Sequence, residues 1–138
     1  MTLMNYLGFD FGLKRIGVAA GQDITRTAKP LLILKAVNGE PVWAEIGSII
    51  QDWRPVALVV GVPHNPEHVD QSTVVRAKQF AQSLGQQFKL PVHTVDEHLT
   101  SFEAKQRLRE QGDGWKIGAK QIDSMAACII LESWLNQC

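Results

Sequence analysis

The sequence predicts an α/β fold in which one mixed five-stranded sheet carries helices on both faces. Three short apolar runs precede any helical spacing and predict three opening antiparallel strands. Helical and strand patterns then alternate along the chain, which is typical of a sheet covered by helices. The 138 residues, 45% of them hydrophobic, suffice for one core without a disulfide or metal. We therefore expect a single domain over residues 1–138.

The opening strands are expected at three places: residues 6–11, 16–20 and 31–37. Residues 12–15, Gly-Leu-Lys-Arg, predict the turn of a hairpin between the first two strands. Asn38 and Gly39 end the third strand. A helix is then expected between Pro41 and Pro55, because apolar side chains recur there at steps of three and four residues. The apolar positions of this helix, expected in its core face, are Trp43, Ile46, Ile50 and Trp53.

The second half of the chain alternates between helix and strand. Short apolar runs predict strands at residues 56–60 and 91–95, and a loop rich in proline and glycine is expected at residues 61–66. Helices are expected at residues 74–88, 100–110 and 121–135, the second opening on a capping box. A glycine-rich loop is expected at residues 111–119.

Charge and cysteine content exclude several classes of protein. Fourteen basic and fourteen acidic side chains give a net charge of zero, unlike a protein that coats nucleic acid non-specifically. Residues 1–35 nevertheless carry five basic and two acidic side chains, which permits a local basic patch. Two cysteines exclude a disulfide framework and a zinc site. No secretion signal or membrane-length apolar run is present, so we expect a cytoplasmic protein with no membrane partner.

Four carboxylates fall at the ends of predicted elements: Asp10, Asp96, Glu97 and Asp123. A carboxylate in apolar surroundings is costly unless it is paired or bound to a cation. Oxygen ligands from several elements suit Mg²⁺, and a pair of such ions would suit phosphodiester hydrolysis. Helix caps and structural ion pairs are the alternative. Neighbours on a strand point to opposite faces, so only one of Asp96 and Glu97 can face the site if the strand continues through them.

Cations, histidines and one tryptophan are further candidate site residues. Lys14 and Arg15 beside Asp10 would suit phosphate contact, or form an ordinary solvated turn. His64 and His68 are separated by a proline-containing segment and indicate a surface loop rather than a metal site, and His93 is expected to be structural. Trp115 either tethers its loop or stacks on a base.

Four motifs in order resemble the YqgF-type family of Holliday-junction-resolvase-like proteins, which are described as nucleases of pre-16S ribosomal RNA. They are Gly-Phe-Asp-Phe-Gly-Leu-Lys-Arg-Ile-Gly-Val-Ala at 8–19, Val-Gly-Val-Pro at 60–63 with Asn65, Asp-Glu-His-Leu-Thr-Ser at 96–101, and Lys-Gln-Ile-Asp-Ser-Met-Ala-Ala at 120–127. The resemblance covers nearly the whole chain. Each motif alone is weak, whereas four at these spacings are specific.

The resemblance implies an RNase H-like fold and a metal-dependent nuclease that matures the 5′ end of pre-16S rRNA in ribosome biogenesis. The catalytic and metal-binding acids would be Asp10, Glu97 and Asp123, holding Mg²⁺ or Mn²⁺. Substrate-binding residues would be Lys14, Arg15, Asn65 and Lys120. The partners would be an rRNA precursor or branched DNA and, through the precursor, ribosomal particles, bound by a monomer or weak homodimer.

Two departures from the family pattern affect substrate contact. His98 stands where the family usually has Arg, and the segment after Asn65 lacks the usual Met-Asp-Gly. Three other functions compete with RNA processing. A DNA four-way-junction resolvase would share the fold and act on a different substrate. A catalytically weak RNA-binding ribosome or transcription factor would keep the fold and have little activity. A nucleotide-binding module of the actin type would need two lobes, which 138 residues do not supply.

Overall fold

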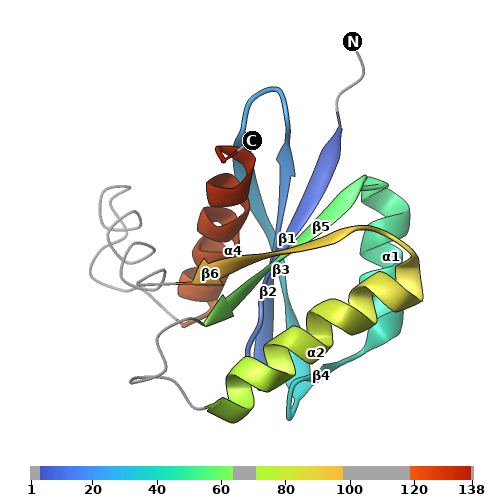
Figure 1. Ribbon diagram of the computed structural model, residues 1–138, viewed down its shortest axis with the longest axis vertical. Helices are drawn as coiled ribbons and strands as arrows, with labels where there is room; N and C mark the ends of the chain where they lie inside the picture. The colour runs from blue at the N-terminus through green and yellow to red at the C-terminus, as the bar shows by residue number, and fades with distance from the viewer. Residues whose placement is uncertain (1–3, 64–70, 98–118, 138) are drawn as a thin grey trace.

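The computed structural model describes residues 4–63, 71–97 and 119–137, with the backbone alone at positions 63, 71, 96, 97 and 119–124. Its centre is a six-stranded sheet in the order β4-β3-β2-β1-β5-β6 (Figure 1). The strands are β1 Asn5–Asp10, β2 Arg15–Gln22, β3 Thr27–Val37, β4 Glu40–Pro41, β5 Ala57–Pro63 and β6 Val92–Glu97. The expected five strands are all present. The sixth, β4, is a two-residue strand formed when the chain turns back at Asn38 and Gly39.

The sheet is mixed, as predicted. β1, β2, β3 and β4 pair antiparallel in sequence order, whereas β5 runs parallel to β1, and β6 runs parallel to β5. The parallel half therefore has one carboxyl edge, at which β1, β5 and β6 all end. Such edges are where open α/β sheets place their sites.

Besides the earlier start of β3, at Thr27 instead of residue 31, two strand boundaries correct the sequence prediction. Gly61, Val62 and Pro63 were expected in a loop but belong to β5, where they pair with β6. Backbone hydrogen bonding to the parallel neighbour overrides the local turn chemistry, and Pro63 is tolerated because it ends the strand. The second correction is that Asp96 and Glu97 do not follow the last strand but form its final two residues.

Three helices are described: α1 Trp43–Trp53, α2 Gln71–Phe88 and α4 Ala119–Leu135. Helix α1 has the predicted bounds and ends where Arg54 takes a left-handed conformation with φ 46° before Pro55. The other two helices begin a few residues earlier than predicted, and helix α4 includes position 119 of the expected loop. The helix expected at residues 100–110 and the remainder of that loop lie outside the described residues.

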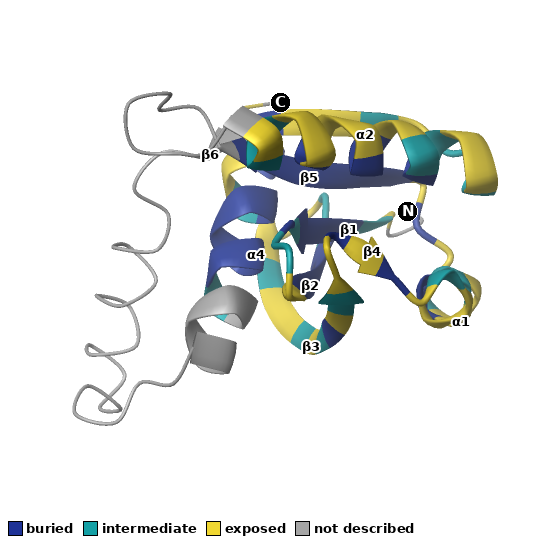
Figure 2. Cartoon of the chain, turned by 90° about the horizontal axis from the view of Figure 1, so that it is seen from below, coloured by how far each residue is buried: buried dark blue, intermediate teal, exposed yellow. Residues whose placement is uncertain are grey.

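Helices cover both faces of the sheet (Figure 2). On one face α1 and α2 enclose an aromatic core, in which Phe80 packs against Phe9 at 5.8 Å between ring centroids and Trp43 at 5.7 Å. The other face packs against α4. There His93 has the structural contact expected of it, stacked on Trp134 at 4.7 Å. Within the described part of the chain, no helix is long and apolar enough to cross a membrane.

Candidate functional site at the carboxyl edge of the sheet

Asp10 is the last residue of β1 and lies on the sheet face that α4 covers. Its neighbours Phe9 and Phe11 are buried in the core on the opposite face, under α1 and α2. Because side chains alternate along a strand, Asp10 shares the α4 face with Gly8. Its cross-strand partners are Gly17 on β2 and Gly61 on β5. Neither neighbouring strand therefore places a side chain directly beside the half-buried Asp10 carboxylate.

The strand register distinguishes positions 96 and 97, which the sequence left open. Position 96 pairs with Val62, whose side chain belongs to the core under α1 and α2. Position 97 has the same parity as Val95, whose side chain packs with Ile130 and Leu131 of α4. By strand alternation, position 97 shares the face of Asp10 and position 96 does not. Of the two acids, Glu97 is therefore the one whose position suits a site with Asp10.

Helix α4 brings position 123 toward the same edge. A Cβ at Gly8 would lie 2.7 Å from Leu131 Cβ and 3.1 Å from the Ala127 carbonyl oxygen, so the helix touches the β1 backbone here. Position 123 precedes Ala127 by one turn on the same helical face, about 6 Å along the axis. Further along the helix, Leu135 reaches Gly21, beside the start of β1. The helix thus runs away from the carboxyl edge, and its first turns, with position 123, lie toward that edge.

A group of cations borders the edge on the β2–β3 side. Arg15 is directly opposite Lys35 in the antiparallel register, and both side chains are exposed. The turn that carries Lys14 is fixed by β3, since the Ala36 amide donates to the Lys14 carbonyl at 2.9 Å. Like charges directly opposite one another repel, so this pair concentrates positive charge at the edge. Lys35 was missed in the sequence because only strand pairing reveals it as a neighbour of Arg15.

The remaining predicted site residues are placed less completely. Lys120 lies in the first turn of α4, where the backbone alone is described. Asn65, His64, His68, His98 and Trp115 lie outside the described residues. Among described side chains, no three His, Cys, Asp or Glu groups gather as a metal site. The carboxylates at positions 10, 97 and 123 are nevertheless an all-oxygen donor set of the kind that Mg²⁺ and Mn²⁺ prefer.

Comparison with known proteins assigns the chain to a family. Residues 4–137 match the model of the RuvX family, described as Holliday junction resolvase. The chain belongs to the RuvX family. A relative from Legionella pneumophila (strain Lens), named "Putative pre-16S rRNA nuclease", is 49% identical over 132 residues, which cover 96% of this chain and 95% of that protein. One of the same name from Azotobacter vinelandii is 47% identical over 133 residues, covering 95% and 92% of the two chains.

A solved structure of low sequence identity shares the fold. RuvC of Thermus thermophilus, in complex with a Holliday junction substrate, superposes with a TM-score of 0.57 at 16% identity, covering 97% of this chain and 94% of that one. At this identity the likeness concerns the fold alone. The RNase H-like fold that the motifs implied is thus confirmed, with six strands in place of five.

Proposed function

We propose that this RuvX protein is a metal-dependent endonuclease that hydrolyses phosphodiester bonds in structured RNA, acting at the 5′ end of pre-16S rRNA. One observation carries the proposal: strand register and the close approach of α4 direct positions 10, 97 and 123 to one face at one edge of the sheet. The names of the RuvX relatives supply the RNA substrate. The protein would meet this precursor within ribosomal particles.

The carboxylates of Asp10, Glu97 and Asp123 would hold divalent cations, with Mg²⁺ favoured and Mn²⁺ as the alternative. Bound ions of this kind activate a water molecule and stabilise the leaving oxygen in phosphodiester hydrolysis. Asp10 is suited to the central role because it ends β1 between two glycines, Gly17 and Gly61, which leave space on the sheet face beside its carboxylate. A residue that supplies a ligand from a strand end needs little rearrangement when an ion binds.

The substrate backbone would lie along the cations at the same edge. Lys14, Arg15 and Lys120 are the cations that the motifs suggest, and Lys35 joins them through its pairing with Arg15. Phosphate oxygens between Arg15 and Lys35 would relieve the repulsion between two like charges. Asn65 would add a neutral contact. The zero net charge of the chain restricts this attraction to a local surface.

The test is single-turnover cleavage of end-labelled pre-16S rRNA in Mg²⁺, in Mn²⁺ and in chelator. Asp10→Asn is expected to lower the rate at least about a hundredfold, because losing a metal ligand removes several kcal/mol of transition-state stabilisation. Asp52→Asn is the matched control, since Asp52 is an exposed acid on α1. Glu97→Gln and Asp123→Asn should behave like Asp10→Asn, while Asp96→Asn should cleave normally. Equal rates in all variants would refute the proposal.

A DNA four-way junction is the second candidate substrate, favoured by the family description and by the fold shared with RuvC. Paired cuts on opposed strands require a symmetric dimer with two sites. The junction is therefore run beside the RNA, with sedimentation of the protein alone and with each substrate. If a dimer cuts the junction in a metal-dependent reaction and leaves the RNA intact, the protein is a DNA junction resolvase and not an RNA nuclease.

If the protein cleaves neither substrate, RNA binding decides between the remaining functions. A protein that binds pre-16S rRNA equally well with and without Asp10→Asn, and never cuts it, would be an RNA-binding factor of ribosome assembly or transcription. Retained RNA binding in chelator would support that outcome, because phosphate contacts by Lys and Arg need no metal.

A further inference from the structure

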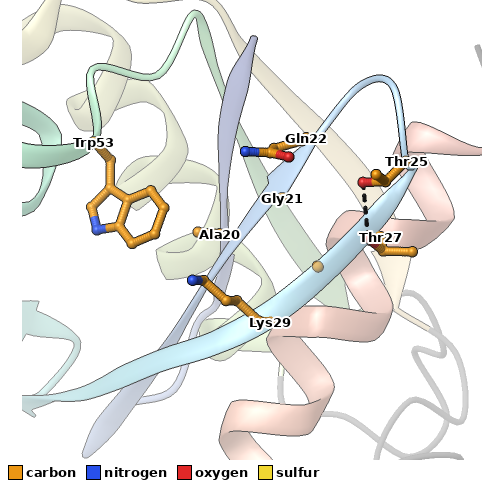
Figure 3. Close-up of a pocket in the computed structure, with 8 residues that line it drawn as sticks. Ala20, Gly21, Gln22, Thr25, Thr27, Lys29 and Trp53 are labelled. Carbon is orange, nitrogen blue, oxygen red and sulfur yellow. Dashed lines mark hydrogen bonds between the residues drawn. The ribbon is translucent and has the colours of Figure 1, made fainter. Parts of the chain in front are cut away.

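A cavity of about 210 Å³ opens at the far end of β1 from Asp10 (Figure 3). It lies between the β2–β3 hairpin and the end of α1, and its lining residues are Ala20, Gly21, Gln22, Thr25, Thr27, Ala28, Lys29 and Trp53. Sites for drug-sized ligands are typically about 300–1,000 Å³. The smaller volume here suits a group no larger than one nucleobase, with any attached sugar and phosphate at the mouth of the cavity.

The lining combines one aromatic ring, neutral polar groups and one positive charge. Lys29 is the only charged residue among the eight, and no carboxylate lines the cavity. Its Nζ lies 5.1 Å from the Trp53 ring centroid. In Figure 3 the side chains of Gln22 and Lys29 both extend toward the ring of Trp53. Gln22 offers an amide that donates and accepts at once, and no hydrogen bond to it is found in the described part of the chain.

The Trp53 ring is held in place by the way α1 ends. The Asn5 side chain donates from Nδ2 to the Trp53 carbonyl at 2.9 Å, and the helix terminates at the left-handed Arg54. The half-buried indole also packs against the core under α1. A ring fixed before binding loses little conformational freedom when a ligand stacks on it.

We propose that this cavity binds one unpaired purine nucleotide, with its base stacked on Trp53 and its phosphate on Lys29. The Gln22 amide would bond the edge of the base, as glutamine does with adenine elsewhere. Base stacking on an aromatic side chain is stronger than an exposed cation–π contact. The base would therefore displace the Lys29 ammonium from the Trp53 ring, and the ammonium would bind the phosphate of the same nucleotide. On the segments that border the cavity, Arg26 and Arg54 are balanced by Asp23 and Asp52, so Lys29 is the cation that would meet a phosphate there.

The inference rests on the proposed function, since the nucleotide belongs to the RNA substrate away from the scissile bond. Five residue steps along β1 separate Asn5 from Asp10, which is about 17 Å, or the rise of about five nucleotides in one strand. The cavity also lies on the opposite sheet face, because Ala20 belongs to the core under α1 and α2. An RNA that reaches both Asp10 and the cavity must pass around the sheet edge. The cavity would therefore bind a nucleotide of the substrate that lies outside the cleavage site. The same chemistry is offered by a free mononucleotide.

The experiment measures binding of a labelled hexa-adenylate RNA, adenosine monophosphate and pre-16S rRNA to the Asp10→Asn protein in chelator. Trp53→Ala is expected to weaken hexamer binding about tenfold, and Trp53→Phe much less. Lys29→Gln should lower the slope of log affinity against log salt by about 0.7, the value for one phosphate of a single strand. Lys78→Gln, an exposed charge change on α2, is the matched control and should change nothing. Gln22→Ala and Lys29→Gln keep the test open should Trp53→Ala fail to fold.

The outcomes separate this inference from the proposed function. Hexamer affinity that is equal in Trp53→Ala, Lys29→Gln and Lys78→Gln, with pre-16S rRNA still bound, would overturn the cavity site alone. No binding of pre-16S rRNA by any variant would overturn the proposed function and the inference with it. Nuclear magnetic resonance of the Trp53 indole N–H, assigned through Trp53→Phe, distinguishes the sources. A shift with the hexamer alone supports an RNA segment, and a shift with adenosine monophosphate alone supports a free nucleotide.

Discussion

Asp10, Arg15 and Lys35 place one acidic and two basic side chains at the carboxyl edge of the sheet, where we propose that the site lies. A carboxylate is half-buried at the end of an apolar strand, and two cations are paired across neighbouring strands on the same sheet face. Strand propensity and apolar packing alone favour neither a half-buried carboxylate nor like charges directly opposite one another. Such departures from local preference are expected at functional sites.

Lys35→Gln gives the first prediction at this scale. Removing one member of the Arg15–Lys35 pair relieves repulsion, so the variant should be as stable as the parent protein or more stable, by up to about 1 kcal/mol. RNA affinity should fall, and its salt slope should decrease by about 0.7–0.9. Chemical denaturation and RNA binding at several salt concentrations measure the two effects, with Lys78→Gln as the control. An unchanged salt slope would show that Lys35 contacts no phosphate.

At the scale of elements, the site depends on how closely α4 approaches the sheet. Gly8 and Gly61 leave no side chains in its path, and a Cβ at Gly61 would overlap the Ile130 side chain. The small side chains of Ala126 and Ala127 are fully buried in the same contact. Small residues on both surfaces let a helix and a strand pack backbone to backbone. This contact fixes how far position 123 lies from β1.

Gly8→Ala tests that contact. The added methyl group would lie 2.7 Å from Leu131 Cβ, so the variant should lose about 1–3 kcal/mol of unfolding free energy through overpacking. Gly47→Ala is the matched control, because the nearest atom to its Cβ is a Phe88 ring carbon at 3.6 Å and the position is helical. That control should gain up to about 1 kcal/mol. Denaturant unfolding measures the unfolding free energy of both variants. Equal values would show that α4 can move away from β1 without loss of stability.

At the scale of the whole molecule, binding at the carboxyl edge should couple to stability. In the proposed metal site, the carboxylates of Asp10, Glu97 and Asp123 would repel one another, and a divalent cation that binds only the folded state would relieve the repulsion. The parallel strands and α4 contribute these carboxylates from distant parts of the sequence. The unfolded chain therefore has no comparable site.

Mg²⁺ at about ten times its Kd should stabilise the protein by about 1.4 kcal/mol, which raises Tm by roughly 3–6 °C. Thermal unfolding with and without Mg²⁺ measures the change. The shift should vanish in Asp10→Asn and persist in Asp52→Asn. In chelator, Asp10→Asn should melt no lower than the parent protein. A Mg²⁺ shift that survives Asp10→Asn would place the cation elsewhere.

The sequence alone determined five of the six strands, the three described helices, the mixed character of the sheet and the four motifs of the family, because hydrophobic spacing and local motifs are properties of neighbouring residues. It also proposed Asp10, Glu97 and Asp123, whose roles stay predictions. Only the tertiary structure decided the strand bounds, side-chain faces and cross-strand neighbours that depend on pairing between distant segments. Parallel pairing with β6 drew residues 61–63 into β5 and gave positions 96 and 97 opposite faces, while the β2–β3 register made Lys35 a neighbour of Arg15. Which residues share a face depends on register, and register is set by contacts that no local pattern contains.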